Sequence, residues 1–510
     1  MNVDRKYEIS NRFFASLVFN ILRGFASFLS VIFIARWLGP QDYGTMVFLL
    51  TSFVAFQAFI DMASTSAFFT FLSKKKRSKK FIQFYWRWIS IQFFLSFFVI
   101  YVILPDSIIN SIWQGESRTL IILAFVASFM QQTVWGIISQ MAEANRESVK
   151  IQKISALFTI GHFFVVFILW KFGMLMLPVI FVALFLEWGV ASIYASRLYY
   201  GENSEQATQE TSDTVSSVFK EFWIYCWPFI PMVFFTFMHN FSSVWMLQEW
   251  GGSTEQAFHG IGIQFASIPM VITASLLKIF WKEIAEAKYL GDMNKVKILY
   301  FKTTRGLFII GSIFAGAVIP WSKEIITLFL GNSYIAGTLP LMLMLIYPVH
   351  QSYGQLTSAM LYATENTKTQ VILSIIFALI GTLVAFLLLS PKAGLQLAAI
   401  GLATKMVFVQ IIEVNTRSYI ISRIFNWKFD WLFQITGLLT CIMLGWICKL
   451  LGQYVLGSNI FIFFPLCLLV YIILVCFFIY LNPSVTGFKI YELKKEIKNI
   501  INYINIIKLP

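Results

Sequence analysis

Fourteen apolar segments, each long enough to cross a lipid bilayer, follow one another along this chain of 510 residues. A spanning helix needs about 20 mostly apolar residues, and inside lipid a helix satisfies its own backbone hydrogen bonds. The predicted spans cover residues 13–36, 45–71, 82–104, 119–141, 151–171, 174–197, 222–248, 258–281, 304–321, 338–362, 369–390, 395–420, 431–451 and 459–481. The sequence therefore predicts an all-α polytopic membrane protein with about 14 transmembrane helices.

The composition supports lipid as the main solvent of the chain. Hydrophobic residues make up 58% of it and charged residues 13%, whereas soluble proteins carry about 25% charged residues. The net charge of +14 raises the question of nucleic acid as a partner. However, the basic residues are divided among short loops and form no basic domain, so we expect no nucleic-acid partner.

The distribution of positive charge orients the spans. Of the 39 Lys and Arg residues, 31 fall in the segments that are cytoplasmic if both termini lie inside, and 6 fall in the outer loops. Such an excess on one side is typical of cytoplasmic loops. The run KKKRSKK (74–80) is the strongest orientation signal, with contact to lipid phosphates as the alternative interpretation. We therefore predict a multi-pass membrane protein with both termini in the cytoplasm.

The loops leave no room for a folded catalytic domain. The longest hydrophilic connection runs from Tyr199 to Phe222. A membrane polymerase or glycosyltransferase would need a large outer loop or an acidic metal-binding motif, and the sequence shows neither. We predict that the protein is not an enzyme and that it carries no metal and no cofactor.

Arg23 lies near the centre of the first span, where an arginine costs roughly 2.5–3.5 kcal/mol. The neighbouring polar residues share its helix face, because Ser16, Asn20, Arg23, Ser27 and Ser30 are spaced by 4, 3, 4 and 3 residues. This polar stripe favours a hydrated cavity. Two interpretations of Arg23 stay open at this point: it binds substrate, or it pairs with an acidic residue, Asp61 of the second span.

Other spans carry polar side chains as well. The candidates for substrate binding are Arg23, Asn20, Ser27, Lys405, Gln132 and Tyr353. The candidates for ion coupling are Asp61, Glu187 and His239. Each has a structural alternative: Glu187 lies near the inner end of its span, His239 is of a type that packs through hydrogen bonds, and Lys405 can extend toward the interface.

Spans 1 and 7 are followed by similar sequences. ARWLGPQDYGTMVFLL follows the first, and LQEWGGSTEQAFHGIGIQFA follows the seventh. Each stretch has a tryptophan, a glycine-containing turn and a second glycine near the start of the next helix. An offset of six spans is typical of two parallel repeats, which many transporters contain. Two prolines in WPFIP (227–231) predict a bend early in span 7.

The stretch ARWLGPQDYG (35–44) resembles a motif of the polysaccharide-export flippases, and the most similar type is the O-antigen (Wzx-like) one. EIITLFLGNSY (324–334) and IFWKEIAEA (279–287) are also similar to that family, which belongs to the multidrug/oligosaccharidyl-lipid/polysaccharide (MOP) superfamily. The resemblance covers about residues 10–480. It implies a fold of the MATE and MurJ kind, with two six-helix lobes around a central cavity plus two C-terminal helices.

The implied domain boundaries follow from the span count. They are residues 1–200 for the N-terminal lobe, 201–221 for a cytoplasmic inter-lobe loop, 222–425 for the C-terminal lobe, 426–482 for two additional transmembrane helices and 483–510 for a cytoplasmic amphipathic tail.

The resemblance also implies a function. Such a flippase moves an undecaprenyl-diphosphate-linked oligosaccharide, a repeat unit of O-antigen, lipopolysaccharide or another surface polysaccharide, to the outer leaflet by alternating access. Relatives hold the anionic headgroup with cations inside the membrane, which is the role that Arg23 matches and Lys405 matches more loosely. The partners implied are this lipid-linked oligosaccharide, membrane lipid and a polysaccharide polymerase. The alternative is a MATE-like exporter of drugs or metabolites.

Overall fold

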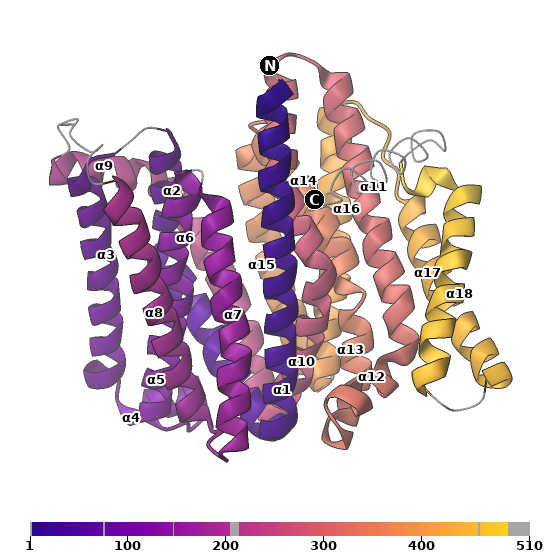
Figure 1. Ribbon diagram of the computed structural model, residues 1–510, viewed down its shortest axis with the longest axis horizontal. Coiled ribbons are helices and arrows are strands. Elements are labelled where there is room, and N and C mark those ends of the chain that lie inside the picture. The colour runs from indigo at the N-terminus through magenta and orange to yellow at the C-terminus, as the bar shows by residue number, and fades with distance from the viewer. Residues whose placement is uncertain (1–2, 75–76, 146, 204–213, 457–459, 488–510) are drawn as a thin grey trace, which may run out of the picture. The chain divides into compact units, whose positions relative to one another are not determined.

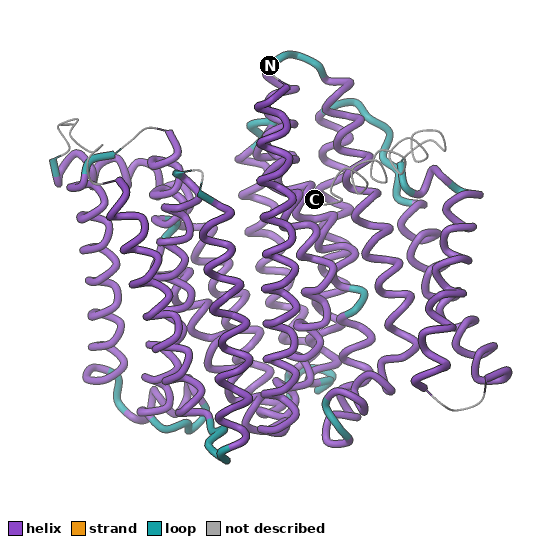
Figure 2. The backbone as a smooth tube through the Cα atoms, in the orientation of Figure 1, coloured by secondary structure: helices purple, strands orange, loops and turns teal. Residues whose placement is uncertain are grey.

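The computed structural model describes residues 3–74, 77–145, 147–203, 214–456 and 460–487 of the chain, and every regular element in these ranges is a helix (Figure 1, Figure 2). In these ranges, twelve helical segments are long and apolar enough to cross a membrane. Two of them, Val18–Asp61 and Val215–Tyr289, are much longer than one crossing requires, and each contains a sharp turn. The all-helical polytopic fold is confirmed, and about 14 spans agrees with twelve segments of which two are double.

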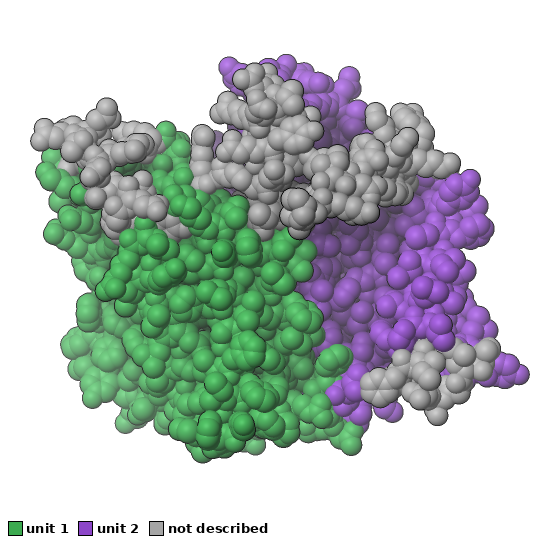
Figure 3. All heavy atoms as spheres, viewed as in Figure 1, with its two compact units in different colours: residues 1–261, 329–333, 374–402 green, residues 262–328, 334–373, 403–510 purple. Residues whose placement is uncertain are grey.

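The chain forms two compact units, which Figure 3 colours separately. Unit 1 comprises Met1–Ile261, Phe329–Ser333 and Ser374–Leu402, and unit 2 comprises Gly262–Leu328, Tyr334–Leu373 and Ala403–Pro510. These units follow from contacts between residues, whereas the predicted lobe boundaries at residues 200 and 222 follow from the count of spans. The lobe boundaries therefore stay a prediction. The predicted tail lies, from residue 488 onward, outside the described residues.

The helices are distributed over both units. Unit 1 holds α1 (Val3–Asp61), α2 (Ser64–Lys74), α3 (Lys79–Phe98), η1 (Val99–Ile103), α4 (Asp106–Trp113), α5 (Arg118–Ser128), η2 (Phe129–Val134), α6 (Trp135–Ala144), α7 (Ser148–Lys171), α8 (Leu177–Asn203), α9 (Val215–Cys226) and η3 (Trp227–Phe229). Unit 2 holds α11 (Met293–Val318), η4 (Ile319–Trp321), α13 (Thr338–Met344), α14 (Tyr347–Ala363), α17 (Leu432–Leu456), α18 (Ile460–Leu481) and η6 (Pro483–Val485). Residues of both units occur in α10 (Ile230–Tyr289), α12 (Ser322–Phe329), η5 (Asn332–Gly337), α15 (Thr367–Leu389) and α16 (Ala398–Ile424).

Two glycines turn the double segments back on themselves. Gly39 in α1 has φ 80° and ψ 170°, and Gly252 in α10 has φ 80° and ψ 177°. This backbone conformation is open essentially to glycine alone. A Cβ added at either position would meet no atom within 4 Å, so the dihedral angles and not a lack of space require glycine. The shared geometry agrees with the repeat that the sequence indicates after spans 1 and 7.

The backbones of α1 and α10 touch just beyond these turns. A Cβ added to Gly44 would lie 1.7 Å from the carbonyl oxygen of Ser253. The Oγ1 atom of Thr45 and the Oγ atom of Ser253 are 3.0 Å apart and share a hydrogen bond. Gly260 packs against Val47 in the same region. Small residues thus allow the two hairpins of unit 1 to meet at backbone contact.

The seventh span begins with a bend, as its prolines predict. The short helix α9 ends at Cys226, a single 3₁₀ turn covers Trp227–Phe229, and α10 begins at Ile230. The first residues of α9 lie within the predicted inter-lobe loop of residues 201–221, so that this range is in part helical.

In unit 2, α17 packs closely on α11. A Cβ added to Gly445 would lie 2.0 Å from the carbonyl oxygen of Gly316, and one added to Gly316 would lie 2.4 Å from that of Cys441. Near the end of α17, the Lys449 ammonium donates to the carbonyl oxygen of Pro320 at 2.7 Å and pairs with Glu324. These contacts fix the first of the two additional C-terminal helices to the rest of unit 2.

Candidate functional site

The second span is broken near its end, and Asp61 stabilises the break. Met62 and Ala63 have φ angles of 46° and 64°, a left-handed conformation that residues with a Cβ rarely adopt. The Asp61 carboxylate accepts hydrogen bonds from the Thr65 backbone N–H at 3.0 Å and from the Ser64 hydroxyl at 2.8 Å. It therefore caps the N-terminus of α2, where the helix dipole favours a negative charge.

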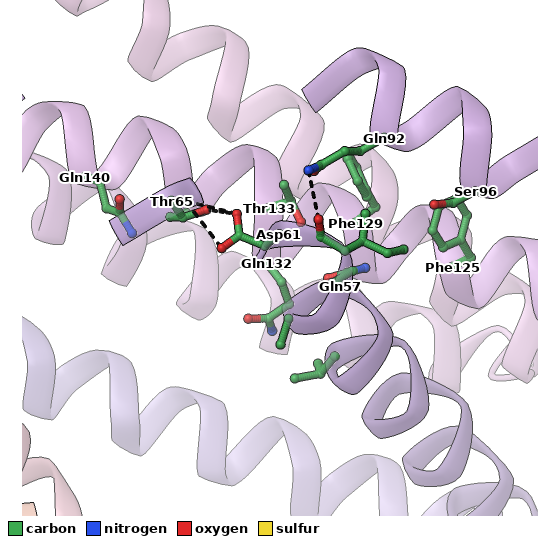
Figure 4. Close-up of a pocket in the computed structure, with 14 residues that line it drawn as sticks. Gln57, Asp61, Thr65, Gln92, Ser96, Phe125, Phe129, Gln132, Thr133 and Gln140 are labelled. Carbon is green, nitrogen blue, oxygen red and sulfur yellow. Dashed lines mark hydrogen bonds between the residues drawn. The ribbon is translucent and has the colours of Figure 1, made fainter. Parts of the chain in front are cut away.

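The fourth span contains a second irregularity. Between α5 and α6, residues Phe129–Val134 form a π-helical turn. Such a turn adds a residue to the helix, shifts the side chains that follow, and occurs often at functional sites. Gln132 and Thr133 lie in this turn, and Figure 4 shows both near Asp61.

These two irregular segments line a cavity of about 220 Å³ in unit 1 (Figure 4). Its polar lining consists of one carboxylate, four amides and three hydroxyls, from Asp61, Gln57, Gln92, Gln132, Gln140, Thr65, Ser96 and Thr133. The amide of Gln92 donates to the Ile60 carbonyl oxygen at 3.1 Å, and that of Gln57 donates to the Ser128 hydroxyl at 3.2 Å. The cavity is smaller than the roughly 300–1,000 Å³ of most ligand sites.

Two acceptor atoms of this cavity are unused. The Oε1 atoms of Gln57 and Gln140 are buried and accept no hydrogen bond from any described residue. Buried polar groups normally have a partner, so these oxygens await a donor or a cation. Together with the Asp61 carboxylate, they suit a proton carrier, a small cation or one or two water molecules. The structure thus brings together two predicted site residues, Asp61 and Gln132.

Glu187 has a partner that the sequence analysis did not identify. Its Oε2 atom lies 2.7 Å from Nδ1 of His162, which joins α8 to α7. The side chains are 15% and 14% exposed. The second carboxylate oxygen, Oε1, is buried and has no hydrogen-bond partner in the described part of the chain. This buried pair joins two neighbouring helices and leaves one carboxylate oxygen without a partner, which is unusual for a buried polar atom.

His239 packs between helices. Its Nδ1 atom donates to the carbonyl oxygen of Ala378 at 3.0 Å and lies 3.3 Å from the Thr382 hydroxyl. A Cβ added to Gly381 would lie 2.4 Å from the His239 ring, so the imidazole occupies the space that this glycine leaves open. The arrangement agrees with the structural interpretation of His239.

The polar stripe of the first span lies on α1. Arg23 is exposed, Asn20 and Ser27 are partly buried, and Ser30 is buried and donates to the Ala26 carbonyl oxygen. Arg23 forms no hydrogen bond and no ion pair with any residue that the structure describes, but Glu143 of α6 attracts it electrostatically. Asp61, the partner considered for it, is instead engaged by Ser64 and Thr65. Pairing between Arg23 and Asp61 is therefore absent from these described contacts.

In unit 2, α16 carries three charged residues on one face. Lys405, Glu413 and Arg417 are spaced by eight and four residues, which places them on one side of a helix. Glu413 pairs with Arg417, and Nη1 of Arg417 donates to the Ser358 hydroxyl at 2.8 Å. Lys405 is 4% exposed and interacts electrostatically with Glu413. The predicted candidate Lys405 thus belongs to a buried charge row.

Tyr353 lies in a cluster of buried hydroxyl groups. Its phenol oxygen accepts a hydrogen bond from the Ser418 hydroxyl at 3.0 Å, and the Tyr300 hydroxyl lies 3.4 Å from the same Ser418 oxygen. The side chain is 3% exposed. These contacts give Tyr353 a packing role within unit 2.

A second cavity, of about 560 Å³, lies in unit 2 and is mostly apolar. Its lining comes from α14, α16, α17 and the segment before α17, and consists of His350, Ile411, Asn415, Phe429, Trp431, Gln434, Ile435, Leu438 and Leu439. The amides of Asn415 and Gln434 donate to each other, at 3.1 and 2.9 Å. Six of the nine lining side chains are apolar, and such a lining suits an alkyl or isoprenoid chain.

The sequence analysis missed several of these residues. His162, Gln92 and Gln140 lie within predicted spans at positions that show no polar stripe, and Arg417 lies close to the predicted end of span 12. Among the residues that the structure describes, no group of three or more His, Cys, Asp or Glu side chains is arranged to hold a metal ion.

The comparisons with known proteins concern the fold. No family model matches the sequence, and no curated protein matches it. Among solved structures, the chain is similar to a lipid II flippase MurJ in an inward closed conformation, with a TM-score of 0.65, 15% identity, and coverage of 93% of this chain and 99% of that one. It is also similar to an inward-facing MATE-family multidrug transporter of the MOP superfamily, with a TM-score of 0.59, 14% identity, and coverage of 81% and 98%.

A third similar structure is a MOP-superfamily transporter from Pyrococcus furiosus, with a TM-score of 0.53, 15% identity, and coverage of 81% of this chain and 95% of that one. These neighbours are transporters, and their fold is that of this chain. The protein is a multi-pass membrane protein with the fold of MOP-superfamily transporters.

Proposed function

We propose that the protein is a flippase that moves an undecaprenyl-diphosphate-linked oligosaccharide from the inner to the outer leaflet by alternating access. The observation that carries this proposal is the charge balance within the spans. The three acidic residues considered above are engaged: Asp61 caps α2, Glu187 pairs with His162, and Glu413 pairs with Arg417. Arg23 is exposed and forms no hydrogen bond or ion pair with a described residue, and Glu143 attracts it electrostatically. An exposed guanidinium group that is not held in an ion pair favours an anionic substrate.

The chemistry of the headgroup fits the guanidinium group of Arg23. A diphosphate offers several oxygens to a guanidinium group, which binds such anions through two parallel hydrogen bonds. Asn20 and Ser27, one turn before and one turn after Arg23, are able to bond sugar hydroxyls that would otherwise lose their hydrogen bonds to water. We assign substrate binding to Arg23, Asn20 and Ser27, with Lys405 as a further cation.

The two cavities receive different roles in this proposal. The 220 Å³ cavity beside Asp61 is too small for an oligosaccharide, so we assign it, with Gln132, to ion or proton coupling. The pair of Glu187 and His162 is a second coupling candidate. The 560 Å³ apolar cavity is suited to part of the isoprenoid tail. His239 and Tyr353 keep packing roles.

The proposed location and domain organisation of the protein follow from its sequence. We propose an inner-membrane protein with both termini in the cytoplasm, two six-helix lobes (residues 1–200 and 222–425) and a functional partnership with a polysaccharide polymerase. The alternative is a MATE-like exporter, which the amide-lined cavity with its single carboxylate favours, because such a cavity suits a small cationic ligand.

The test is a flipping assay with purified protein in vesicles that contain a fluorescent undecaprenyl-diphosphate oligosaccharide, read by its accessibility to an added glycosidase. We expect flipping by wild type, a loss of at least tenfold in Arg23→Ala, and partial activity in Arg23→Lys, which keeps the charge without the fork. The control is Lys392→Ala, which removes one positive charge from a predicted outer loop. A buried arginine is not used as the control, because its replacement would also disturb packing. Wild type without activity that still exports a cationic dye would favour the exporter.

A further inference from the structure

The short helix α9 has one face packed on the membrane-spanning part of unit 1. Its buried residues are Val218, Phe222 and Cys226. The Phe222 ring contacts Phe71 of α2 at 5.3 Å and Tyr85 of α3 at 5.7 Å between centroids. Figure 1 shows α9 lying crosswise at the end of unit 1 where α2 ends and α3 begins. The helix is therefore attached to the ends of two spans and is not itself a span.

An arginine fixes this attachment. Nη1 of Arg77 donates to Oε2 of Glu221 at 2.9 Å, and Nη2 donates to the other carboxylate oxygen. The guanidinium group lies 5.3 Å from the ring of Phe71 and 4.8 Å from that of Phe81. The Arg77 side chain is 3% exposed. A two-point ion pair between two aromatic rings holds α9 in one orientation.

A second face, about 100° around the helix from the packed one, is aromatic and exposed and continues from α9 into η3. Phe219, Trp223 and Trp227 are spaced by four residues, and their rings stack with centroid distances of 6.5 and 6.0 Å. Their exposed fractions are 54%, 53% and 60%. Val215 and Ile224 are also exposed on this helix. An ordered row of aromatic rings without a protein partner in the described structure requires an apolar environment, and next to membrane-spanning helices that environment is lipid.

The charges around α9 specify which part of the lipid is involved. Lys220 on α9, Lys74 at the end of α2, and Lys79 and Lys80 at the start of α3 are all exposed. They belong to the same end of unit 1, and most come from the run KKKRSKK. A helix with aromatic residues on one face and lysines beside them is typical of the boundary between headgroups and acyl chains. The lysines attract lipid phosphates.

We propose that α9 and the exposed lysines Lys74, Lys79, Lys80 and Lys220 form a binding surface for anionic phospholipids of the bilayer. Trp223 and Trp227 lie at the boundary of the acyl chains, while the lysines contact the phosphate groups above them. This surface selects lipid by charge and is separate from any substrate site. The proposal does not depend on what the protein transports.

The experiment uses the whole protein in nanodiscs and measures quenching of tryptophan fluorescence by brominated lipids. Quenching assigned to α9 is the difference between wild type and the double variant Trp223→Phe/Trp227→Phe. Brominated phosphatidylglycerol and brominated phosphatidylcholine are compared at equal mole fraction in a zwitterionic host. Trp113 is 2% exposed and packs against Phe53, so Trp113→Phe is the control that should change the quenching by neither lipid.

We expect the α9 tryptophans to be quenched more strongly by brominated phosphatidylglycerol, and this preference to fall as salt is added. The variant Lys74→Gln/Lys79→Gln/Lys80→Gln should lower the preference at least about fivefold, which is the effect of one interfacial lysine. The matched control Lys282→Gln/Lys297→Gln/Lys368→Gln removes the same charge from exposed positions of unit 2 and should leave the preference unchanged.

Two results would overturn the proposal. Equal quenching by both lipids, unaffected by the lysine variant, would show that the aromatic row contacts lipid without selecting charge. No quenching by either lipid would place the row in water or against another protein. Melting temperatures of all variants show that they are folded, so a loss of preference with normal melting counts as support.

Discussion

Replacing Gly44 by alanine should force apart the two helical hairpins of unit 1. The added Cβ would lie 1.7 Å from the carbonyl oxygen of Ser253 and 3.1 Å from the backbone nitrogen of Ala257. Ordinary contact begins at 3.4 Å, so the backbones of α1 and α10 must separate by roughly 1.7 Å. The contacting atoms belong to the backbone and therefore cannot move aside as the end of a flexible side chain would.

The energetic effect has two sources. Overpacking of a close contact costs about 1–3 kcal/mol. The separation also lengthens the 3.0 Å hydrogen bond between Thr45 and Ser253 beyond bonding distance, which costs about 0.5–1.5 kcal/mol. We therefore expect Gly44→Ala to lose about 2–4 kcal/mol of stability in the conformation with the hairpins closed.

A disulfide reports the contact directly. The two hydroxyl oxygens of Thr45 and Ser253 are close enough for Thr45→Cys and Ser253→Cys to form a bond after the five native cysteines are replaced by alanine. We expect rapid cross-linking in the double-cysteine protein that keeps Gly44 and slow cross-linking in the one that also carries Gly44→Ala. The Gly44→Ala protein should also have the lower melting temperature in detergent. Gly161→Ala is the control, because a Cβ there meets no atom within 4 Å. If Gly44→Ala cross-links and melts like the parent protein, the close approach is not a feature of the resting protein.

Three further predictions concern single sites. Arg77→Ala should release α9 and raise its proteolysis severalfold, because it removes a buried two-point ion pair, while Arg77→Lys should retain part of the attachment. Burial raises the pKa of the Glu116 carboxyl, so the folded state favours the protonated form of this group. The melting temperature should therefore fall as the pH rises above the ordinary pKa of glutamate. Glu116→Gln still bonds Thr45 and should remove that dependence. Glu187→Gln should lower the rate of transport with normal protein levels, and His162→Gln should lower it as well, because the two side chains form one buried pair.

Each of these has an outcome against it. Unchanged proteolysis of Arg77→Ala would mean that the aromatic contacts of α9 suffice. An unchanged melting profile in Glu116→Gln would place the titration elsewhere. A lower rate of transport in Glu187→Gln alone would make His162 a packing residue.

The sequence predicts two site residues of the cavity beside Asp61, Asp61 itself and Gln132. Gln57 and Asp61 on span 2 share a face, Ser128 and Gln132 on span 4 share another, and the structure joins the two faces through the bond from Gln57 to Ser128. The sequence did not indicate the break itself. Met62 and Ala63 are ordinary apolar residues, and their left-handed conformation follows from the capping by Asp61 and from tertiary packing.

The remaining site residues depend on contacts between helices. His162 and Glu187 are 25 residues apart in sequence and meet because α7 and α8 pack side by side in one rotational register. Periodicity within one span carries no information about that register. Arg417 lies near the predicted end of the span of residues 395–420, whereas α16 continues to Ile424 and places Arg417 beside Glu413 in the interior of the helix.

Arg23 should bind the headgroup with different affinities in the different conformations of the transport cycle. An unpaired guanidinium group within a span costs roughly 2.5–3.5 kcal/mol, and an anionic headgroup that pairs with it removes part of this cost. A transporter must also release that headgroup, so the affinity has to differ between conformations, and a ligand shifts an equilibrium only through such a difference.

Locking the hairpins with the Thr45→Cys/Ser253→Cys disulfide holds one conformation, and reduction releases it. We expect a soluble prenyl-diphosphate analogue to bind the locked and the reduced protein with affinities that differ by about 5–150-fold, the usual range of coupling between sites. The difference should shrink in Arg23→Ala and persist in Lys392→Ala. Equal affinities in the locked and reduced states would separate Arg23 from the conformational cycle, even if Arg23→Ala still weakens binding.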